Sequence, residues 1–432
     1  MALVLNIKEA DYLVLGIGSG GIASARRAAK HGAKVIAVES SRYGGTCVNV
    51  GCVPKKVTWN AAAIAETLKD AKAYGFQVQE QRLFDWPVYE KNLDKDGIQH
   101  FRGRAKFVGK NEVEIALENG GTQRVKAKHI LIATGGRPKK PEIPGSELCI
   151  DSDGFFDLNS QPKSIATSGA GYIGVEMTGM LHSLGSKTYF SIRGDKLLRT
   201  FDPMIQDAIT NEYERQGISL YKGTSIIKVE DIGNGMKRVT FRESESKKES
   251  TVKVEAVLFA TGRDPEIEDF HIKDFDIKLN DENHIVTDEY QNTNLDNIYA
   301  IGDVCDCGFQ LTPVAIAAGR RLSDRLFGGR IGAHLTYENI PSVVFAHPEI
   351  GSIGLTEPEA CEKYGDKVRT YRSEFTAMYF VMMEQDEKQL TAYKIICVGE
   401  EERVVGLHIL GQGQQRDPAR FQRSDQYGRY EA

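Results

Sequence analysis

Short apolar runs recur along the chain, and most of them end in glycine. The run Tyr12–Gly16 is followed by an alanine-rich stretch, Ile22–His31, and then by a second apolar run, Lys34–Glu39. Continuous apolar runs of this length are typical of buried parallel strands, and the stretch between them is long enough for a helix. The pattern therefore predicts a β-α-β unit near the start of the chain.

The same pattern returns further along the chain. Apolar residues 164–168 precede a glycine-rich turn, a helical stretch reaches Leu184, and a second strand pattern covers 187–192. Two such units predict two dinucleotide-binding modules in one chain. Two other apolar runs end in an Ala-Thr-Gly triplet, and strand patterns after residue 340 indicate a terminal α+β domain.

Length and composition narrow the class of protein. The 432 residues are enough for roughly three domains, and 41% hydrophobic with 27% charged residues is typical of a soluble globular protein. A net charge of −5 provides no basic field, so no nucleic-acid partner is predicted. No apolar run reaches the ~18 residues of a membrane span, and the first residues lack a signal-peptide pattern. We therefore predict no membrane partner and a cytosolic location, with a mitochondrial form possible through another start site.

The first glycine-rich motif, Gly16-Ile-Gly-Ser-Gly-Gly21, joins the first predicted strand to the first helix. Its glycines allow a tight turn and let backbone N–H groups approach a pyrophosphate at the helix N-terminus. Glu39 ends the second strand, where a carboxylate accepts hydrogen bonds from ribose hydroxyls. Because strand, helix and acid are in register, we interpret the motif as a dinucleotide site rather than a structural turn.

The second motif, Gly169-Ala-Gly-Tyr-Ile-Gly174, has a different residue at the end of its second strand. The position equivalent to the acid is Ile192, beside Arg193 and shortly before Arg199. Two guanidinium groups can pair with a 2′-phosphate, which an acid would repel. The motif predicts NADPH rather than NADH; the alternative is that both arginines are ordinary solvated surface residues.

Seven cysteines, an odd number in a long chain, argue against a secreted disulfide framework. Cys47 and Cys52 lie in the stretch Gly44–Lys55. On a regular helix with a rise of ~1.5 Å per residue they would be almost 8 Å apart, too far for an unstrained disulfide. Gly51 and Pro54 would allow the distortion that brings the sulfurs together, and a strained disulfide suits exchange. The alternatives are two buried thiols or half a metal site, and no further ligand at suitable spacing favours the metal.

A later apolar run ends in Gly302-Asp303, with Leu311–Arg320 following. The carboxylate would lie at the carboxyl edge of a sheet, where the ribityl hydroxyls of a flavin would lie. The element Cys305-Asp-Cys307 is unusual after this motif. Two cysteines without further ligands seldom bind a metal ion, so no metal site is predicted.

Together these motifs resemble the pyridine nucleotide-disulfide oxidoreductases, and within them the glutathione reductases, from about residue 10 to Gly411. The resemblance implies an α/β fold with two Rossmann-like domains, one for FAD and one for NADPH, and a C-terminal α+β interface domain, truncated here. The implied boundaries are 1–152 for the FAD domain, 153–282 for the NADPH domain, 283–339 for a return to the FAD domain, and 340–432 for the incomplete interface domain.

The resemblance also implies a reaction: electrons pass from NADPH through FAD to a Cys47–Cys52 disulfide and then to oxidised glutathione. Cys52 would face the flavin and Cys47 would attack the substrate. Lys55 and Glu176 match the ion pair beside the flavin, and Tyr172 matches the ring that gates the nicotinamide pocket. A buried cation there would stabilise the reduced, anionic flavin, and the carboxylate would offset the cost of burying it.

By the same resemblance, the FAD-binding residues are Gly16, Gly18, Ser19, Gly20, Gly21, Glu39, Thr46, Lys55, Thr134, Gly135, Asp303 and Thr312. The NADPH-binding residues are Gly169, Gly171, Tyr172, Ile173, Glu176, Arg193, Arg199 and Gly262. The substrate residues are Ala23, Arg26 and Arg320, which match positions that meet the carboxylates of oxidised glutathione. Relatives for cationic substrates carry an acid and a bulky aromatic around the first helix, and lipoamide relatives lack the arginine.

The chain departs from the family pattern towards its C-terminus. Family members carry a His-Pro-Thr motif whose histidine is the general acid/base, and this sequence lacks it. His347 and His408 are given no catalytic role, and His408 is expected in a core or dimer contact. The polar tail after Gly411 suggests a frameshift, because Arg416–Glu431 read one nucleotide later can spell the expected helix. The direct join after Glu90 suggests a mis-assigned splice junction.

Two alternatives follow from these departures. The chain could be a catalytically impaired FAD- and NADPH-binding protein without the acid/base histidine, unstable or monomeric where the family forms homodimers. It could also be a relative that reduces another disulfide, such as lipoamide.

Overall fold

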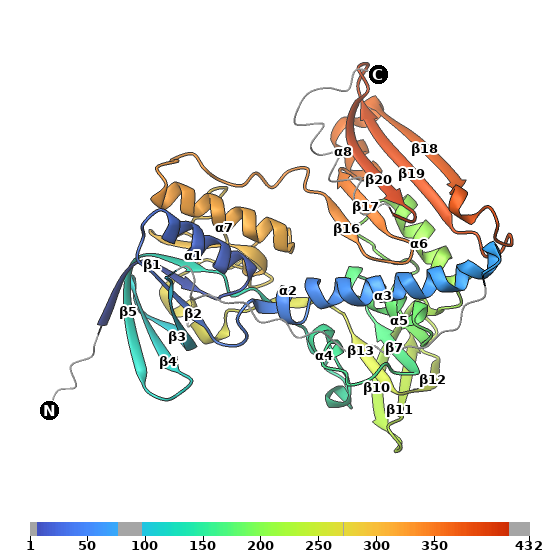
Figure 1. Cartoon of the computed structure of the whole chain (residues 1–432), viewed down its shortest axis with the longest axis horizontal. Helices are drawn as coiled ribbons and strands as arrows, with labels where there is room; N and C mark the ends of the chain where they lie inside the picture. Colours follow the sequence, from blue (N-terminus) through green and yellow to red (C-terminus); the bar gives the residue numbers. More distant parts are fainter. Residues whose placement is uncertain (1–6, 77–96, 271, 414–432) are drawn as a thin grey trace. The chain divides into compact units, whose positions relative to one another are not determined.

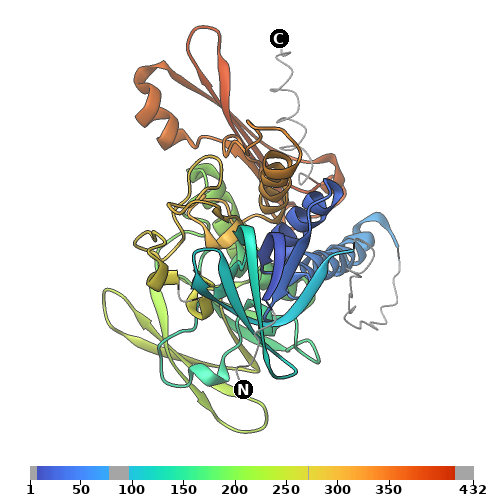
Figure 2. The ribbon, with the colours of Figure 1, turned by 90° about the vertical axis from the view of Figure 1, so that its left-hand side faces the viewer.

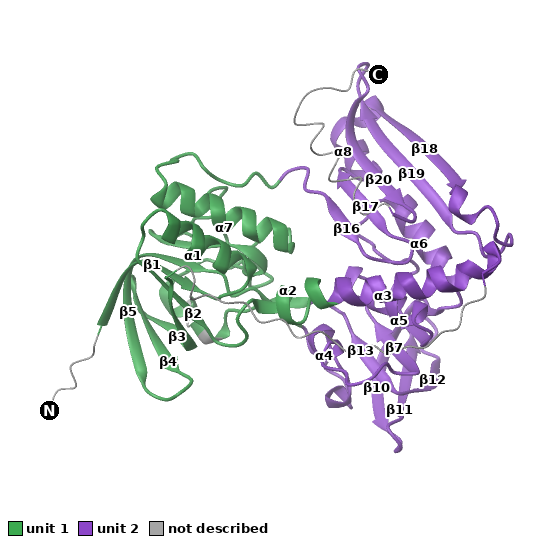
Figure 3. Cartoon of the chain, in the orientation of Figure 1, with its two compact units in different colours: residues 1–54, 86–138, 263–337 green, residues 55–85, 139–262, 338–432 purple. Residues whose placement is uncertain are grey.

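A computed structural model of the chain describes residues 7–76, 97–270 and 272–413. The chain divides into two compact units (Figure 3). Unit 1 comprises residues 1–54, 86–138 and 263–337, and unit 2 comprises residues 55–85, 139–262 and 338–432. The predictions about the join near Glu90 and about the tail beyond residue 413 fall outside the described residues.

Unit 1 is built on a six-stranded sheet in which β1 (Ile7–Leu15) lies between β2 (Val35–Glu39) and β5 (Thr122–Ile132), parallel to both. The short strand β15 (Ile298–Ala300) extends the parallel part beyond β5. Alternate residues of β1 enter two different cores, so the strand is buried on both faces. The first predicted β-α-β unit is confirmed, because α1 (Ser19–Lys30) connects β1 to β2.

Two hairpins complete this sheet. The strand β3 (Gln99–Gly109) first runs parallel to β2 and then pairs antiparallel with β4 (Glu112–Leu117), which in turn pairs with β5. Figure 2 shows these strands side by side in cyan. A separate two-stranded sheet joins β6 (Gly136–Pro138) to β14 (Arg263–Pro265).

The helices α1 and α7 (Thr312–Phe327) pack against each other over the unit 1 sheet (Figure 1). Their backbones come very close, because a Cβ atom at Gly319 would lie 2.7 Å from the carbonyl oxygen of Gly20. The other helical segments of unit 1 are α2 (Gly45–Asn49), the start of α3 (Cys52–Asp70), η4 (Glu268–Phe270), η5 (Ile272–Phe275) and η6 (Gly302–Val304).

Unit 2 contains a parallel sheet in the order β13-β7-β8-β9, formed by Ala256–Phe259, Ser164–Ser168, Lys187–Ser191 and Ser219–Tyr221. The helix α5 (Tyr172–Ser183) connects β7 to β8, which confirms the second predicted β-α-β unit. A three-stranded antiparallel sheet follows, formed by β10 (Thr224–Asp231), β11 (Lys237–Glu243) and β12 (Glu249–Val254).

The C-terminal part of unit 2 is an antiparallel sheet in the order β16-β17-β20-β19-β18. Its strands are β16 (Ser342–Val344), β17 (Ile350–Gly354), β18 (Val368–Thr376), β19 (Leu390–Val398) and β20 (Arg403–Leu410). The helix α6 (Pro203–Arg215) shares one core with β8 of the parallel sheet and with strands of this antiparallel sheet. The other helical segments are the rest of α3, η1 (Ala71–Tyr74), η3 (Ser146–Leu148), α4 (Ser152–Phe155), α8 (Glu357–Tyr364), η7 (Gly365–Lys367) and η8 (Met378–Phe380).

The chain is thus an α/β protein with both parallel and antiparallel sheets. Across the described residues, we find no helix with the length and apolar character that a membrane crossing requires.

Candidate active site

The first glycine motif forms an open turn at the N-terminus of α1. Gly16 has φ 96°, and a Cβ there would lie 2.4 Å from the carbonyl oxygen of Ala133. A Cβ at Gly21 would lie 2.0 Å from the carbonyl oxygen of Gly16, so helix and strand need a glycine at this contact. Gly18, the N-cap, has no atom within 3.4 Å of its Cβ position, which leaves the helix N-terminus accessible to an anion.

The second glycine motif in unit 2 repeats this geometry. Gly169 has φ 121°, and its Cβ would lie 2.2 Å from the carbonyl oxygen of Ala260. A Cβ at Gly174 would lie 2.1 Å from the carbonyl oxygen of Gly169, whereas Gly171 has nothing within 4 Å of its Cβ position. In each of the two β-α turns, two glycines therefore allow close backbone contacts, and the third leaves the helix N-terminus open. This arrangement suits a phosphate at each helix N-terminus.

The ends of the two second strands differ, as the sequence predicts. Glu39 is buried at the end of β2, where its carboxylate accepts the N–H groups of Ile17 and Ser41, each at 2.8 Å. Burial raises the pKa of this carboxyl above its ordinary value. In unit 2, Arg193 and Arg199 are exposed after β8. The segment between them folds back onto the glycine loop, because the Leu198 N–H donates to the Ala170 carbonyl at 2.8 Å.

Cys47 and Cys52 lie on two different helices, because α2 ends at Asn49 and α3 begins at Cys52. Gly51 makes this break possible: a Cβ there would lie 2.8 Å from the carbonyl oxygen of Thr46. All seven cysteines of the chain lie in described residues, and none forms a disulfide. The hydrogen bond of the Cys47 thiol to Cys52, together with burial, raises the pKa of Cys47. The two sulfurs therefore meet through a break in the helix.

The N-terminal turn of α7 faces this cysteine pair. The Cys52 sulfur lies 3.2 Å from the hydroxyl oxygen of Thr312, which is the first residue of α7. A helix N-terminus carries a partial positive charge and favours a thiolate over a thiol. The position suits a cysteine that is an anion in the reduced state.

Three further predicted flavin residues, Thr134, Gly135 and Asp303, follow strands of unit 1. Asp303 lies in η6, directly after β15, and burial raises its pKa. The Thr134 hydroxyl donates to the Glu266 carbonyl at 2.6 Å, and the Glu266 N–H donates to the Gly135 carbonyl at 2.9 Å. These contacts fix the segment after β5.

The predicted substrate residues occupy two neighbouring helices of unit 1. Ala23 and Arg26 lie one turn apart on α1, and Arg320 lies on α7; both arginines are exposed and Ala23 is half-buried. The helices are joined by a hydrogen bond of 2.9 Å between the hydroxyls of Ser24 and Ser323. The two guanidinium groups therefore stand on one packed helix pair.

In unit 2, the structure brings Lys55 and Glu176 together. The Lys55 Nζ donates to both carboxylate oxygens of Glu176, at 2.8 and 3.0 Å. The Lys55 side chain is 15% exposed and that of Glu176 is 2% exposed. Tyr172 and Ile173 form the first turn of the same helix, α5. Gly262 follows β13 with φ 133° and accepts the Lys139 N–H at 3.0 Å.

Phe345 contacts this ion pair, although the sequence analysis assigns it no role. Its backbone N–H donates to a Glu176 oxygen at 2.9 Å, and the Lys55 Nζ lies 4.7 Å from the centre of its ring. The ring thus makes a cation–π contact with the ammonium group. The strand patterns after residue 340 contain no signal for a contact of Phe345 with residues of α3 and α5.

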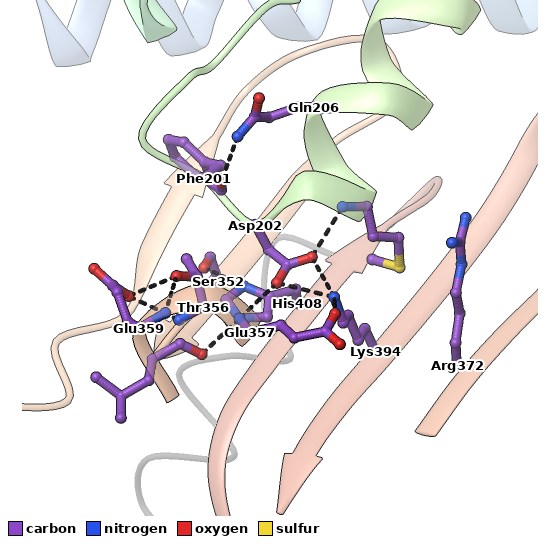
Figure 4. Close-up of polar contacts among 12 residues, drawn as sticks. Phe201, Asp202, Gln206, Ser352, Thr356, Glu357, Glu359, Arg372, Lys394 and His408 are labelled. Atoms are coloured by element: carbon purple, nitrogen blue, oxygen red, sulfur yellow. Dashed lines mark hydrogen bonds and ion pairs between the residues drawn. The ribbon is translucent and has the colours of Figure 1, made fainter. Parts of the chain in front are cut away.

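A second buried charge cluster, which sequence reasoning missed, holds α6, α8 and β19 together (Figure 4). Asp202 accepts from the Lys394 Nζ at 2.9 and 3.1 Å and from the N–H groups of Met204 and Glu357. Lys394 also forms an ion pair with the Glu357 carboxylate. Two signals could have found it: Asp202 precedes a proline at a helix start, and Lys394 interrupts an apolar strand.

The two histidines without an assigned role are both buried. His408 lies in β20, where its ring contacts the Ser352 hydroxyl at 2.7 Å and the Leu355 carbonyl at 2.9 Å. This burial confirms that it lies in a core. His347 stacks on Trp59 with ring centroids 5.7 Å apart, and its Nδ1 lies 3.1 Å from the Glu66 carboxylate.

Two glycine turns that suit phosphates and a convergent cysteine pair are typical of an oxidoreductase that uses a nucleotide and a dithiol. Residues 10–319 match the pyridine nucleotide-disulphide oxidoreductase family, and residues 340–417 match the dimerisation domain of that family. The chain belongs to this family.

Among its relatives are proteins named glutathione reductase. The protein from Yarrowia lipolytica is 46% identical over 94% of this chain and 91% of its own length. The protein from Schizosaccharomyces pombe is 47% identical over 94% of this chain and 90% of its own length, and that from Debaryomyces hansenii is 44% identical over 95% and 92%. The predicted resemblance to glutathione reductases, and with it the prediction of a flavoprotein disulfide oxidoreductase, is confirmed.

Proposed function

We propose that the chain reduces oxidised glutathione with electrons from NADPH, through FAD and the Cys47–Cys52 pair. The observation that supports this most is the convergence of the two sulfurs at the break between α2 and α3, beside Thr312 at the N-terminus of α7. A dithiol in this environment can form a strained disulfide and be reduced to a thiol and a stabilised thiolate. The proposed domains are those expected from the sequence: FAD, NADPH and interface.

The residues of unit 1 fit a flavin dinucleotide. The open N-terminus at Gly18 suits the pyrophosphate, the Glu39 carboxylate suits ribose hydroxyls, and Asp303 suits the ribityl chain. When bound, FAD would supply the two-electron chemistry that connects a pyridine nucleotide to a disulfide. In unit 2, the open N-terminus at Gly171 would receive the pyrophosphate of NADPH, and Arg193 and Arg199 would pair with its 2′-phosphate.

The side chains of the protein would carry out the disulfide exchange, stabilise charge on the flavin and bind the substrate. Cys47 would lose its proton and attack one sulfur of the substrate disulfide, whose S–S bond breaks and releases one glutathione thiolate. Cys52, a thiolate stabilised by the Thr312 hydroxyl and the α7 N-terminus, would then attack the Cys47 sulfur, which re-forms the Cys47–Cys52 disulfide and releases the second glutathione. The Lys55 ammonium, held by Glu176, would stabilise negative charge that develops on a bound flavin. Arg26 and Arg320 would pair with the carboxylates of oxidised glutathione beside the small side chain of Ala23.

The test follows the absorbance of bound flavin without oxygen. NADPH should bleach the flavin, and oxidised glutathione should restore its colour and be consumed. The Cys47→Ser variant should still be bleached but should consume no oxidised glutathione, while the control Cys361→Ser, which removes an exposed cysteine, should behave as the unchanged chain does. A protein without bound flavin, or one that bleaches with NADH as readily as with NADPH, would contradict the proposal.

A second candidate is a protein that binds both cofactors but turns over poorly. The lack of a His-Pro-Thr motif favours it, because the only His-Pro pair places His347 in a core with 3% exposure. Loss of a general acid/base typically lowers a rate by roughly 10²–10⁴. Bleaching without consumption of oxidised glutathione would favour this candidate, and recovery with lipoamide instead would favour a relative with another substrate.

The chain carries the family dimerisation domain, and that domain leaves large apolar side chains exposed. They are Tyr371, Phe375, Met378, Val381 and Met382. Apolar groups that cluster on a surface often mark a protein contact. The expectation that this chain is monomeric stays a prediction, and light scattering tests it: a two-fold dimer would contradict it.

A further inference from the structure

Unit 1 contains a second pair of cysteines that the proposed reaction does not use. Cys305 and Cys307 follow η6, the turn that carries Asp303. Their thiols both donate to the carbonyl oxygen of Gly302, with sulfur–oxygen distances of 3.1 and 3.9 Å. The two thiols are also near enough for each to shift the pKa of the other. Two sulfurs therefore converge on one carbonyl group.

The two thiols have unequal surroundings. Cys305 is 4% exposed, and its hydrogen bond to Cys307 together with burial raises its pKa well above the ordinary value. Cys307 is half-buried between the exposed residues Asp306 and Gly308, and the hydrogen bond from Cys305 lowers its pKa. In such a pair, the accessible and readily ionised thiol is the nucleophile. The buried neutral thiol is the resolving thiol, which attacks the mixed disulfide that the first thiol forms.

The backbone around the pair opposes a permanent disulfide. Cys305 is extended, with φ −104° and ψ 163°, and the Asp306 N–H holds the chain to the Ile285 carbonyl at 3.1 Å. Only Asp306 separates the two cysteines, so a disulfide between them would close a ring across a single residue. A disulfide here would contract the turn and store strain, so thiols would reduce it readily.

A metal ion does not explain the pair. Within residues 7–76, 97–270 and 272–413, no group of three or more His, Cys, Asp or Glu side chains is arranged to hold a metal ion. Structural thiolate sites for zinc use four ligands, so two sulfurs alone are insufficient.

We propose that Cys305 and Cys307 form a second, reversible redox site, oxidised by a small-molecule disulfide of the glutathione type. The Cys307 thiolate attacks one sulfur of that disulfide, its S–S bond breaks, and one thiolate leaves. The Cys305 thiol then loses its proton to solvent and attacks the Cys307 sulfur, which releases the second thiol. The protein pair loses two electrons, and the small disulfide gains them. This redox site goes beyond the proposed function, because in the proposed reductase reaction neither Cys305 nor Cys307 passes electrons to the substrate.

The test maps oxidation by mass spectrometry and requires no turnover. Trypsin places the two cysteine pairs in separate peptides, residues 279–320 for Cys305 and Cys307 and residues 43–55 for Cys47 and Cys52. The full-length protein is reduced, freed of reductant, incubated with oxidised glutathione, and alkylated before digestion. The peptide 279–320 should lose both alkylation sites and become lighter by two hydrogen atoms, and reduced glutathione should restore both sites.

Variants then separate the roles of the two sulfurs. Cys305→Ser should retain one glutathione on Cys307 as a mixed disulfide, and Cys307→Ser should leave Cys305 open to alkylation. Cys361→Ser removes an exposed cysteine elsewhere and should leave the result for the peptide 279–320 unchanged. Two alkyl groups on that peptide after oxidation of the wild-type protein would overturn the proposal. Because the readout is a peptide mass, failure of the proposed reductase activity would not be mistaken for failure of this site.

Discussion

Two buried lysine–carboxylate pairs in unit 2 have nearly the same geometry but different surroundings. The Lys55–Glu176 contacts are 2.8 and 3.0 Å long, and the Lys394–Asp202 contacts are 2.9 and 3.1 Å long. Asp202 is 0% exposed and Lys394 is 6% exposed, whereas Lys55 is 15% exposed. Distance alone therefore does not distinguish the pair with a proposed function from the other pair.

The two pairs differ in how many N–H donors of the lysine remain without a hydrogen-bond acceptor. Both oxygens of Asp202 accept a backbone N–H in addition to Lys394, and Lys394 also meets the Glu357 carboxylate. Among the described residues, the Lys55 ammonium donates only to Glu176 and otherwise contacts the Phe345 ring. An ammonium group has three N–H donors, so Lys55 keeps capacity for a bound group. A pair whose donors all have acceptors connects secondary-structure elements. A pair with an unused donor can also bind a reacting group.

The largest effect is expected from Lys394→Met, which leaves Asp202 buried without its cation. Removing one member of a buried ion pair costs about 3–5 kcal/mol of unfolding free energy. Urea unfolding followed by circular dichroism should show this loss, while the rate per folded molecule stays unchanged. The exposed Lys253→Met on β12 serves as the control and should change stability by less than ~0.5 kcal/mol. Equal stability of the two variants would mean that the Asp202 cluster does not hold α6 to β19.

Lys55→Gln should have the opposite pattern of effects: a small loss of stability and a large loss of rate. It removes the positive charge but keeps a donor for Glu176, so we expect a smaller loss of stability than for Lys394→Met. Loss of one preorganised electrostatic group lowers a rate by roughly 10²–10³. Stopped-flow measurement of flavin reduction by NADPH should show this drop, and Lys55→Arg should recover part of the rate. A variant that lost stability but reduced flavin at the normal rate would place Lys55 with the structural pairs.

Some of the features compared here could be predicted from the sequence, and others could not. Both glycine turns and the break between the cysteines have local signals in the sequence, because the positive φ of Gly16 and the contact of Gly51 with Thr46 each favour a glycine. Lys55 and Glu176 came from family resemblance, since they are 121 positions apart. Asp202 and Lys394 are 192 positions apart, and each residue alone looks like an ordinary helix cap or strand lysine. Contacts at such separations depend on how sheets and helices pack, which periodicity does not specify.

A smaller effect is expected from acid, and it should distinguish the two pairs further. Burial alone would raise the pKa of Asp202, but hydrogen bonds from the Glu357 N–H, Lys394 and the Met204 N–H outweigh it, so the pKa is lowered. A carboxyl whose pKa is lower in the folded state adds stability above its unfolded pKa of about 3.9, and this stability is lost as the pH falls through the folded pKa.

The measurement compares the unfolding free energy of the wild-type chain and Asp202→Asn from pH 7 down to pH 3. Asparagine keeps the helix cap but cannot ionise. The difference between the two proteins should be constant above about pH 5 and should shrink below about pH 4, where the wild-type carboxyl gains its proton. A difference that stayed constant down to pH 3 would show that ionised Asp202 adds no stability of its own.

The smallest effect is expected from Phe345→Leu, which tests whether the ring tunes Lys55. The substitution removes the ring beneath the ammonium but keeps the backbone N–H that donates to Glu176. A cation–π contact is worth about 0.5–1 kcal/mol at partly exposed sites, so flavin reduction by NADPH should slow only two- to six-fold, roughly. Phe375→Leu, which removes a half-exposed ring of β18, is the matched control and should leave the rate unchanged. In the Lys55→Gln background Phe345→Leu should have no further effect on the rate, because the ring acts only through the cation; an equal slowing in both backgrounds would assign Phe345 to packing.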